Sequence, residues 1–314
     1  MRSWIGLTEE TYNPPTMTRR NPRLLLAALG ANAVFSGACA LLLLLDADVI
    51  APLYGDLPSV WLGVIGALLA GFVPFLLLAA HQASGPQPRS MFALVAIVLD
   101  LIWVVGSIIL LPWVLSVSST AGITLFLGVA FVVAGLAWLQ WWGVGRLYAA
   151  ADVALRTSHR IELTVDLDVS AHLLWPVIAD LGGIDRYFDG LSEALVHGAP
   201  GVGAVRTCAN GRGQRWSEEV TQWLPPREFA MRFQSERDDF PYPMDPMFGG
   251  WQIKEHGLGG SQVTVWWSFT TRPRWLSPAL ITLMLEKVRP DMVSTIHSMA
   301  RAARAESARS RATA

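Results

Sequence analysis

The hydrophobic positions of the chain follow two different patterns. In the first half, four long apolar runs follow one another, at residues 24–45, 60–80, 91–111 and 123–144. Each run has about the 20 residues that a helix needs to cross a hydrocarbon core ~30 Å thick. Beyond residue 158, short segments alternate apolar and polar residues with the period of two that is typical of strands. The chain is therefore predicted to form a membrane α-helical bundle of four transmembrane helices, followed by a soluble domain that contains a sheet.

The soluble half is predicted to combine helices with an antiparallel sheet. A strand over 160–169 comes first, and an apolar helical segment and a second short helix follow it. Six more alternating runs are separated by turn residues such as Asn210–Gly211 and Pro225–Pro226, which is typical of hairpins. A long helix from about 278 to 305 ends the pattern. We expect a soluble α+β domain with an antiparallel seven-stranded sheet.

The distribution of charge marks the boundary between the two halves. Of the 24 basic and 25 acidic residues, 18 and 19 respectively lie beyond residue 150. We expect the linker to be a short helix and the last segment to be disordered. The predicted division is an N-terminal tail, a membrane domain, a linker, a soluble domain and a C-terminal tail, at 1–22, 23–148, 149–158, 159–305 and 306–314.

The basic residues of the first half indicate the orientation of the spans. They lie in the N-terminal tail, in the second loop at Arg89, and after the fourth span at Arg146. The first loop instead carries Asp46, Asp48 and Asp56, and the third loop is uncharged. By the positive-inside rule, both termini and the soluble domain are cytoplasmic. We expect a multi-pass protein of a bacterial-type cytoplasmic (inner) membrane.

The glycine-rich stretch 198–208, GAPGVGAVRTC, could be a phosphate-binding loop or a turn. A phosphate loop follows a strand and opens a helix, and the P-loop form ends in Gly-Lys-Ser/Thr. Here no lysine and no helical pattern follow, because the chain continues as an alternating run to the Asn210–Gly211 turn. We therefore expect a turn between two strands.

Three stretches of the soluble half resemble the START-like polyketide cyclase/dehydrase and lipid-transport superfamily, also called SRPBCC. DVSAHLLWPVIADLGGIDRYF resembles its opening, PGVGAVRTC followed by SEEVTQWLPPREFAMRF its hairpin, and SQVTVWWSFT its penultimate element. The resemblance covers about residues 159–305. It implies the helix-grip fold, in which a curved sheet wraps a long C-terminal helix around an internal cavity for a hydrophobic ligand. The superfamily includes lipid carriers, cyclases and hormone receptors, so the resemblance alone selects no function.

In such a fold, alternate strand residues and one helix stripe line a cavity, for which we expect a few hundred Å³. Aromatic and methionine side chains at these spacings either line the cavity or fill an ordinary core. Methionine-rich walls suit a loosely shaped apolar ligand. The residues expected to contact it are Arg206, Trp216, Glu218, Phe229, Met231, Trp251, Trp267, Phe269, Met292 and Ile296.

Arg206 and Glu218 lie on neighbouring predicted strands and are expected to meet across a hairpin. On the inner face they would hold the polar end of a ligand, and on the outer face they would form a cross-strand ion pair. A shift of one residue in the strand register moves a side chain to the other face. The sequence therefore leaves both interpretations open.

The loop SERDDFPYPMDPMFGG, at 235–250, is rich in aromatic residues, proline and methionine. It could cover the mouth of the cavity as a lid, contact the membrane, or only pack on itself. The lid residues that we expect are Phe240, Tyr242, Met247 and Phe248.

Asp100 lies near the middle of the third apolar run. A charge at that depth costs about 2.5–3.5 kcal/mol, so the side chain is expected to face the bundle interior or to be protonated. Asn32 in the first run is a candidate hydrogen-bond partner. Asp100 is either a proton or substrate site or a polar clamp between helices.

No pattern points to catalytic residues, a metal or a cofactor. Of the five histidines in the soluble half, no two stand at the spacing of metal ligands. The formal net charge of −1, without a clustered basic face, argues against a nucleic-acid partner.

Three functional hypotheses follow. The first is a membrane-anchored cytosolic binding or transfer domain for a hydrophobic ligand, such as a membrane lipid, an isoprenoid or a polyketide-like molecule. The second is a membrane-bound cyclase or dehydratase that uses Glu218, Arg206 or Asp185. The third is a non-catalytic assembly or scaffold factor whose transmembrane helices dock a protein partner, which predicts a filled core without a cavity.

Overall fold

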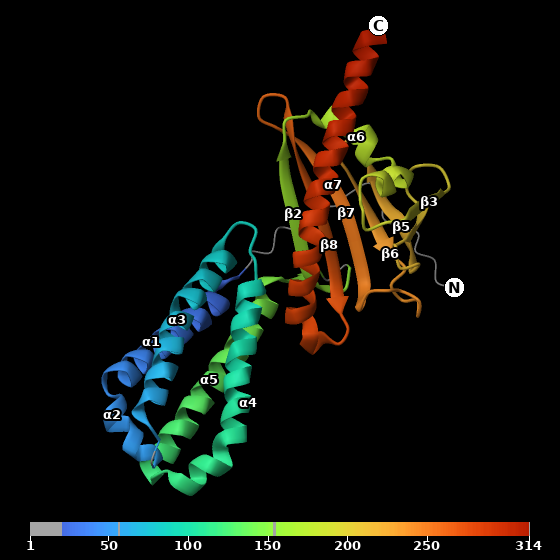
Figure 1. Cartoon of the computed structure of the whole chain (residues 1–314). Coiled ribbons are helices and arrows are strands. Elements are labelled where there is room, and N and C mark those ends of the chain that lie inside the picture. Colours follow the sequence, from blue (N-terminus) through green and yellow to red (C-terminus); the bar gives the residue numbers. More distant parts are fainter. Residues whose placement is uncertain (1–20, 56, 153–154, 314) are drawn as a thin grey trace.

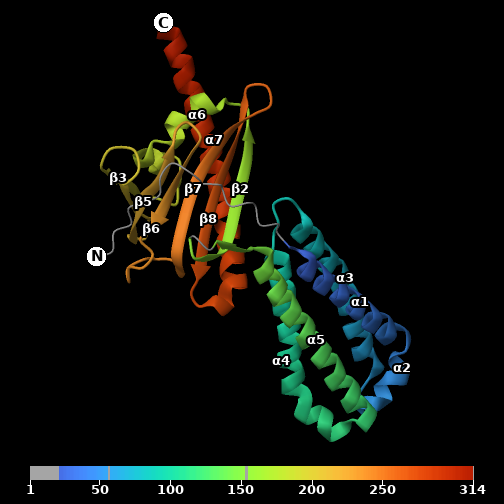
Figure 2. The same cartoon turned by 180° about the vertical axis from the view of Figure 1, so that it is seen from behind.

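The computed structural model describes residues 21–55, 57–152 and 155–313, which form two domains. A long helical bundle is joined end to side to a domain built from one sheet and one long helix (Figures 1 and 2). Almost all of the expected N-terminal tail, 1–22, lies outside the described residues.

Four helices of the bundle are long and apolar enough to cross a membrane. Large apolar side chains cover its outer surface, and Phe131, for example, is 81% exposed. Such a continuous apolar surface is typical of a region that contacts lipid or a partner. The four helices are α1 (Arg23–Leu45), α3 (Ser59–Ser84), α4 (Met91–Val117) and α5 (Thr120–Leu147). Two short helices, α2 (Ala47–Ile50) and η1 (Ala51–Tyr54), lead from α1 toward α3.

Small residues let the helices approach closely near the C-terminal domain. Ala79, Ala83, Ala93 and Ala96 are buried between α3 and α4 and their neighbours. Gly143 of α5 lies against the backbone of Leu25 in α1, where an added Cβ would stand 2.7 Å from the Leu25 Cα. Close backbone approach over small residues is a common way to pack helices in a membrane.

The C-terminal domain is an eight-stranded antiparallel sheet that curves around one long helix, α7 (Ser277–Thr313) (Figure 1). The strand order is β1-β2-β8-β7-β6-β5-β4-β3. Helix α6 (Ala171–Ile178) and the 3₁₀ helix η2 (Leu181–Arg186) follow β2, and the 3₁₀ helix η3 (Arg274–Leu276) precedes α7. The strands are β1 (Ala149–Asp152), β2 (Thr157–Leu167), β3 (Glu193–His197), β4 (Val205–Ala209), β5 (Arg215–Leu224), β6 (Glu228–Phe233), β7 (Met244–His256) and β8 (Gly260–Thr271).

The core of this domain lies between the concave face of the sheet and α7. Strand β2 alternates buried and half-buried residues along most of its length, as the sequence pattern predicts for a strand with one covered face. Helix α7 contributes a stripe at helical spacing, including Val288, Met292, Ile296 and Met299. The helix-grip class of fold is therefore confirmed.

Three details differ from the sequence-based expectations. Residues 149–152 of the linker form β1 rather than a helix, because they pair with β2 and so add an eighth strand. Strand β7 begins at Met244, so Met247 and Phe248 are strand residues rather than loop residues. Helix α7 continues to Thr313 through the segment expected to be a disordered tail, whose alanines, arginines and glutamate favour helix.

The first part of the stretch 198–208, residues 198–204, connects β3 to β4 in a hairpin and the rest begins β4, in agreement with its interpretation as a turn between two strands. Gly198, Gly201 and Gly203 have φ values of 94°, 148° and 87°, which side chains other than glycine rarely adopt. The glycines therefore serve the turn geometry.

The two domains share a continuous apolar contact. Leu25, Ala83 and Tyr148 of the bundle end belong to the same buried cluster as Phe269 of β8 and Ile281 of α7. Polar contacts surround it. The Ser90 Oγ lies 2.7 Å from the Thr282 Oγ1 and 3.0 Å from the Tyr148 Oη, and Gln87 Nε2 donates to the Thr164 carbonyl at 2.8 Å.

The close approach of α1 and α5 generates a prediction. Gly143→Leu is expected to destabilise the bundle by about 1–3 kcal/mol, because its side chain would overlap the backbone of Leu25. Gly135→Leu on the same helix is the matched control, since an added Cβ there meets nothing within 4 Å. The measurement is the unfolding midpoint of the full chain in detergent. Equal midpoints for the two variants would contradict the observed packing.

Candidate functional site

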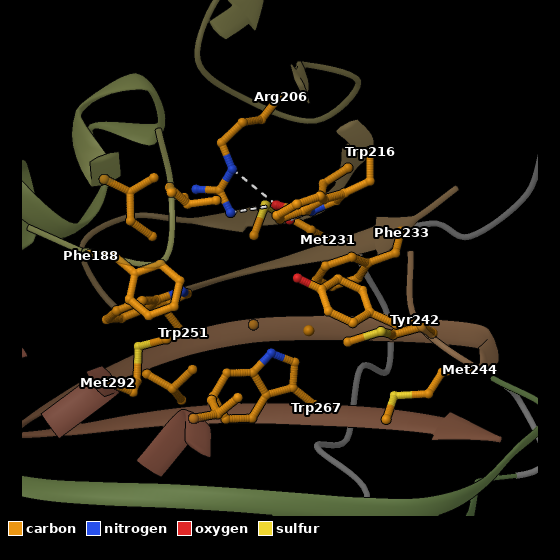
Figure 3. Close-up of a pocket in the computed structure, with 18 of the residues that line it drawn as sticks. Phe188, Arg206, Trp216, Met231, Phe233, Tyr242, Met244, Trp251, Trp267 and Met292 are labelled. Atoms are coloured by element: carbon orange, nitrogen blue, oxygen red, sulfur yellow. Dashed lines mark hydrogen bonds and ion pairs between the residues drawn. The ribbon is translucent and has the colours of Figure 1, made fainter. Parts of the chain in front are cut away.

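A cavity of about 150 Å³ lies between the sheet and the middle of α7. Its walls are almost entirely apolar, and five of the nine methionines of the chain line it: Met231, Met244, Met247, Met284 and Met292. Figure 3 shows Arg206 and Trp216 on one side of the cavity and Trp267 on the opposite side. The volume is smaller than the few hundred Å³ that the fold class suggested, because these long side chains fill much of the space.

The polar part of the wall is an ion pair between Arg206 and Glu218. The two residues are direct cross-strand partners in β4 and β5, and both side chains face the interior. They share this face with the buried Cys208 and Val220, so the register that buries these apolar residues also buries the pair. Arg206 is 4% and Glu218 is 3% exposed. The alternative of an ion pair on the outer face is therefore excluded.

The carboxylate of Glu218 is held on both oxygens. Arg206 Nε donates to Oε2 at 2.9 Å and Arg206 Nη2 donates to the same oxygen. The indole N–H of Trp216 donates to Oε1 at 2.7 Å. On the other side of the guanidinium, Arg206 Nη1 reaches the carbonyl of Leu181 in η2 at 3.4 Å. The pair is thus fixed in position by three different elements.

The surroundings of Arg206 and Cys208 keep both side chains protonated, so that Arg206 is a cation and Cys208 a neutral thiol. Burial is the largest single effect on Arg206 and disfavours its charged guanidinium, but the charge and hydrogen bond of Glu218, together with the contribution of Cys208, outweigh burial and raise the pKa of Arg206. Burial, together with the negative charge of Glu218, raises the pKa of Cys208 to about 12. Because the thiolate is the nucleophile, Cys208 is unreactive at neutral pH.

Aromatic side chains pack against one another beside the ion pair in the cavity wall. Tyr242, in the connection between β6 and β7, meets the ring of Trp216 edge-on at 5.5 Å and that of Phe240 at the same distance. Phe240 in turn contacts Phe233 of β6 at 6.4 Å. Of the four lid residues expected, Tyr242 and Met247 line the cavity, Phe240 packs behind Tyr242, and Phe248 is not among the lining residues.

Seven of the ten predicted contact residues line the cavity, and three do not. Phe229, Phe269 and Ile296 are fully buried in the surrounding core instead. Phe229 packs against Trp175 and Trp223, and Phe269 stacks on His159. The seven that line the cavity are Arg206, Trp216, Glu218, Met231, Trp251, Trp267 and Met292.

The residue-by-residue prediction missed part of the wall. The chain after α6 brings Ile184, Phe188 and Leu191 to the cavity, and no strand periodicity marks these positions. Met244 was missed because β7 begins five residues before the run that the sequence suggests. Met284 and Val288, in contrast, belong to the helical stripe of α7 that the sequence predicts to line the cavity, and both line it.

The bundle carries a separate buried polar cluster. Asn32 Nδ2 and Gln140 Nε2 both donate to the Asp100 Oδ2 at 2.8 Å, and Ser36 Oγ donates to the Asn32 Oδ1 at 3.1 Å. The acid thus bridges α1, α4 and α5. Gln140 carries no signal in the sequence beyond being a polar residue in an apolar run.

In the described part of the chain, no group of three or more His, Cys, Asp and Glu side chains is arranged to hold a metal ion.

Residues 158–304 match the family model described as "Polyketide cyclase / dehydrase and lipid transport". The match agrees with the order of the elements and with the cavity under α7. The C-terminal domain is a member of this family, fused to a bundle of four apolar helices.

Several solved structures are similar to part of the chain. The Zhui aromatase/cyclase from Streptomyces sp. R1128 is 19% identical and covers 46% of this chain and 93% of its own, with a TM-score of 0.39. Norcoclaurine synthase from Thalictrum flavum, solved with dopamine and hydroxybenzaldehyde, is 13% identical and covers 45% of this chain and 84% of its own, with a TM-score of 0.38. Protein XoxI from Bacillus cereus is 15% identical and covers 46% of this chain and 94% of its own, with a TM-score of 0.38. No curated protein matches the sequence.

The buried ion pair generates a prediction about stability. Glu218→Met leaves the Arg206 cation buried without its partner and is expected to cost about 3–5 kcal/mol, and Arg206→Met is expected to have an effect of similar size. The double variant Arg206→Met/Glu218→Met removes both charges and is expected to be more stable than either single variant. The measurement is urea unfolding of the full chain in detergent, followed by near-ultraviolet circular dichroism. If the loss in free energy of unfolding of the double variant equals the sum of the losses of the two single variants, the two side chains do not stabilise each other.

Proposed function

We propose that the protein is a membrane-anchored binding domain that takes up a hydrophobic small molecule from the adjacent leaflet. The observation that carries this proposal is the apolar cavity under α7 with a buried ion pair in its wall. An apolar body would be solvated by the aromatic and methionine side chains. A polar group at its end would meet Arg206 or Glu218.

The volume of the cavity and the side chains in its wall limit the size of the ligand that it can hold. An apolar space of ~150 Å³ is enough for one small aromatic ring. A lipid, isoprenoid or polyketide-like molecule needs more room, which side-chain movement would have to provide. Methionine has three rotatable side-chain bonds and adapts its shape more easily than branched residues do. The five methionines of the wall therefore support a cavity that widens around its ligand.

The contact between the domains supports exchange with a membrane. Phe233, Met244 and Met247 line the cavity, and they belong to the same apolar cluster as Leu25 and Ala83 of the bundle. A ligand that moves along this cluster stays in contact with apolar side chains between bilayer and cavity. The positive-inside rule puts the cavity on the cytoplasmic side of a multi-pass membrane protein.

One edge of the C-terminal domain supports direct contact with lipid head groups. Pro278, in the first turn of α7, lies 3.6 Å from the Cβ position of Gly145 in the last turn of α5. The start of α7 is therefore level with the end of a span. Trp275 of η3 is 69% exposed there and Leu283 of α7 is 55% exposed, with the exposed Arg274 beside them. Tryptophan with arginine is typical of a membrane interface.

The two other functional hypotheses differ in their support. A scaffold with a filled core does not account for the cavity. A cyclase or dehydratase is consistent with the family and with the ion pair, although Cys208 is unsuited to act as a nucleophile. Glu218 and Arg206 are the candidate acid and base groups of such an enzyme. Asp185 does not line the cavity.

The ligand hypothesis predicts an effect of filling the cavity. Native mass spectrometry of the full chain, released from detergent, is expected to detect a bound small molecule. Val288→Trp fills the cavity from α7 and is expected to abolish this adduct. Leu283→Trp adds the same ring on the exposed side of α7 and should retain it. The absence of any adduct on the wild type, together with no binding of a naphthol carrying an octyl chain, would overturn the proposal.

Uptake from the leaflet predicts an effect on rate without an effect on affinity. For the full chain in nanodiscs, the double variant Trp275→Ser/Leu283→Ser is expected to slow the arrival of membrane-dissolved octyl-naphthol in the cavity several-fold, because the edge contacts lipid less well. The amount bound at equilibrium should not change. Leu195→Ser, an exposed apolar position on β3, is the matched control. Equal rates for all three proteins would show that the edge plays no part.

A further inference from the structure

A second and larger cavity lies between the helices of the bundle, in the half that is remote from the C-terminal domain, and is partly open, since the lining residues Trp61 and Leu110 are 58% and 51% exposed. Its volume is about 610 Å³, within the range of ~300–1,000 Å³ in which small-molecule sites fall. Residues of α1, α3, α4 and α5 line it, and Ile50 and Tyr54 of the α2–η1 segment bound it at the far end. The site is separate from the cavity under α7, which shares none of its residues.

The composition of the helices explains why the space exists at this depth. Near the C-terminal domain, buried alanines and Gly143 draw the helices together. Beyond the Asp100 cluster, the residues that line the cavity are mostly leucine, tryptophan and phenylalanine, although α1 and α3 still approach closely at Gly66. Small residues permit close approach of helices in a membrane, and bulky ones do not.

The wall of this cavity is apolar and none of the described residues in it carries a charge. The hydroxyl of Ser107 is engaged, because it donates to the Trp103 carbonyl at 2.8 Å. The carboxylate oxygen of Asp100 that accepts from Asn32 and Gln140 lies in the polar cluster, outside the lining. A charged ligand would therefore lose its hydration without gaining a partner.

One donor in the wall is unused. Trp103 of α4 lines the cavity, and its indole Nε1 has no hydrogen-bond partner among the described residues. This nitrogen is buried beneath the cavity surface, so the indole ring has to rotate to present its N–H to a ligand. A hydrocarbon core offers an exposed N–H no acceptor of its own. A carbonyl oxygen is an acceptor that brings no donor of its own into the apolar space.

From these observations we propose that the bundle cavity binds an uncharged, lipid-soluble molecule with a carbonyl oxygen, which accepts a hydrogen bond from the Trp103 indole. The inference rests on the bundle spanning a bilayer, as proposed above. It does not depend on any ligand in the cavity under α7. The bundle therefore contains a ligand site of its own, reached from the lipid.

The test uses octyl-benzophenone, an uncharged aryl ketone whose excited carbonyl inserts into nearby C–H bonds. The full chain in phosphatidylcholine nanodiscs is illuminated with the probe, and the labelled peptides are mapped. Labels are expected on the cavity walls of α3, α4 and α5, and to be competed by unlabelled long-chain ketone. Labels spread evenly over the outer faces of the bundle would overturn the proposal.

Matched variants separate the site from general lipid contact. Ser107→Leu adds bulk to the wall and is expected to suppress labelling of the cavity peptides, as is Val129→Phe from α5. Gly106→Leu adds the same bulk one residue away, where an added Cβ meets nothing within 4 Å, and should leave labelling unchanged. The two filling variants keep the test informative if one of them fails to fold. If a folded filling variant is labelled like the wild type, the site is disproved.

The hydrogen bond has its own test. Trp103→Phe removes the donor but keeps an aromatic ring, and it is expected to weaken labelling by the ketone about three- to tenfold. Labelling by a diazirine of the same chain length without a carbonyl should change much less. Trp138→Phe, on the exposed face of α5, is the control for loss of an indole. An unchanged ketone affinity in Trp103→Phe would overturn the assignment of a carbonyl ligand.

Discussion

The packing of α7 is the constraint on which the rest of the structure depends. One apolar stripe of this helix, from Ile281 to Met299, has to be covered. The curved sheet covers most of it, and the end of the helical bundle covers its first turns. The same helix therefore closes the core, forms one wall of the cavity and attaches the domain to the bundle. Because these three roles share one rigid element, the position of the cavity relative to the bundle follows from how α7 is packed.

The buried ion pair shows how apolar burial can decide an electrostatic question. Charged side chains rarely enter a core unless they are paired. In β4 and β5, the inner face is selected by apolar neighbours such as Cys208 and Val220, and Arg206 and Glu218 follow because they alternate with the same period. Trp216 donates a further hydrogen bond to Glu218, and Arg206 donates one to a carbonyl of η2. These hydrogen bonds reduce the free-energy cost of burying the two charges. The result is one polar spot in an otherwise apolar wall.

The two cavities have a common physical origin in side-chain size. Where small residues lie between helices, as at Gly143, the bundle is closely packed. Where long or aromatic side chains meet at an angle, space remains, as around Trp103 in the bundle and around the methionines under α7. Between these regions lies the apolar cluster that joins the domains. These two apolar spaces therefore lie one on each side of a tightly packed junction.

The sequence by itself determined the two domains, the four helices long and apolar enough to span a membrane, the fold class of the C-terminal half and seven residues of one cavity wall. These features depend on periodicity and length, which are local properties of the chain. Three things were decided only by the tertiary structure. The face taken by Arg206 and Glu218 depends on strand register. The wall residues Ile184, Phe188 and Leu191 come from the short 3₁₀ helix η2 and the irregular backbone after it, which are too short to show a hydrophobic period. The bundle cavity depends on how four separate helices meet, which no single stretch of sequence encodes.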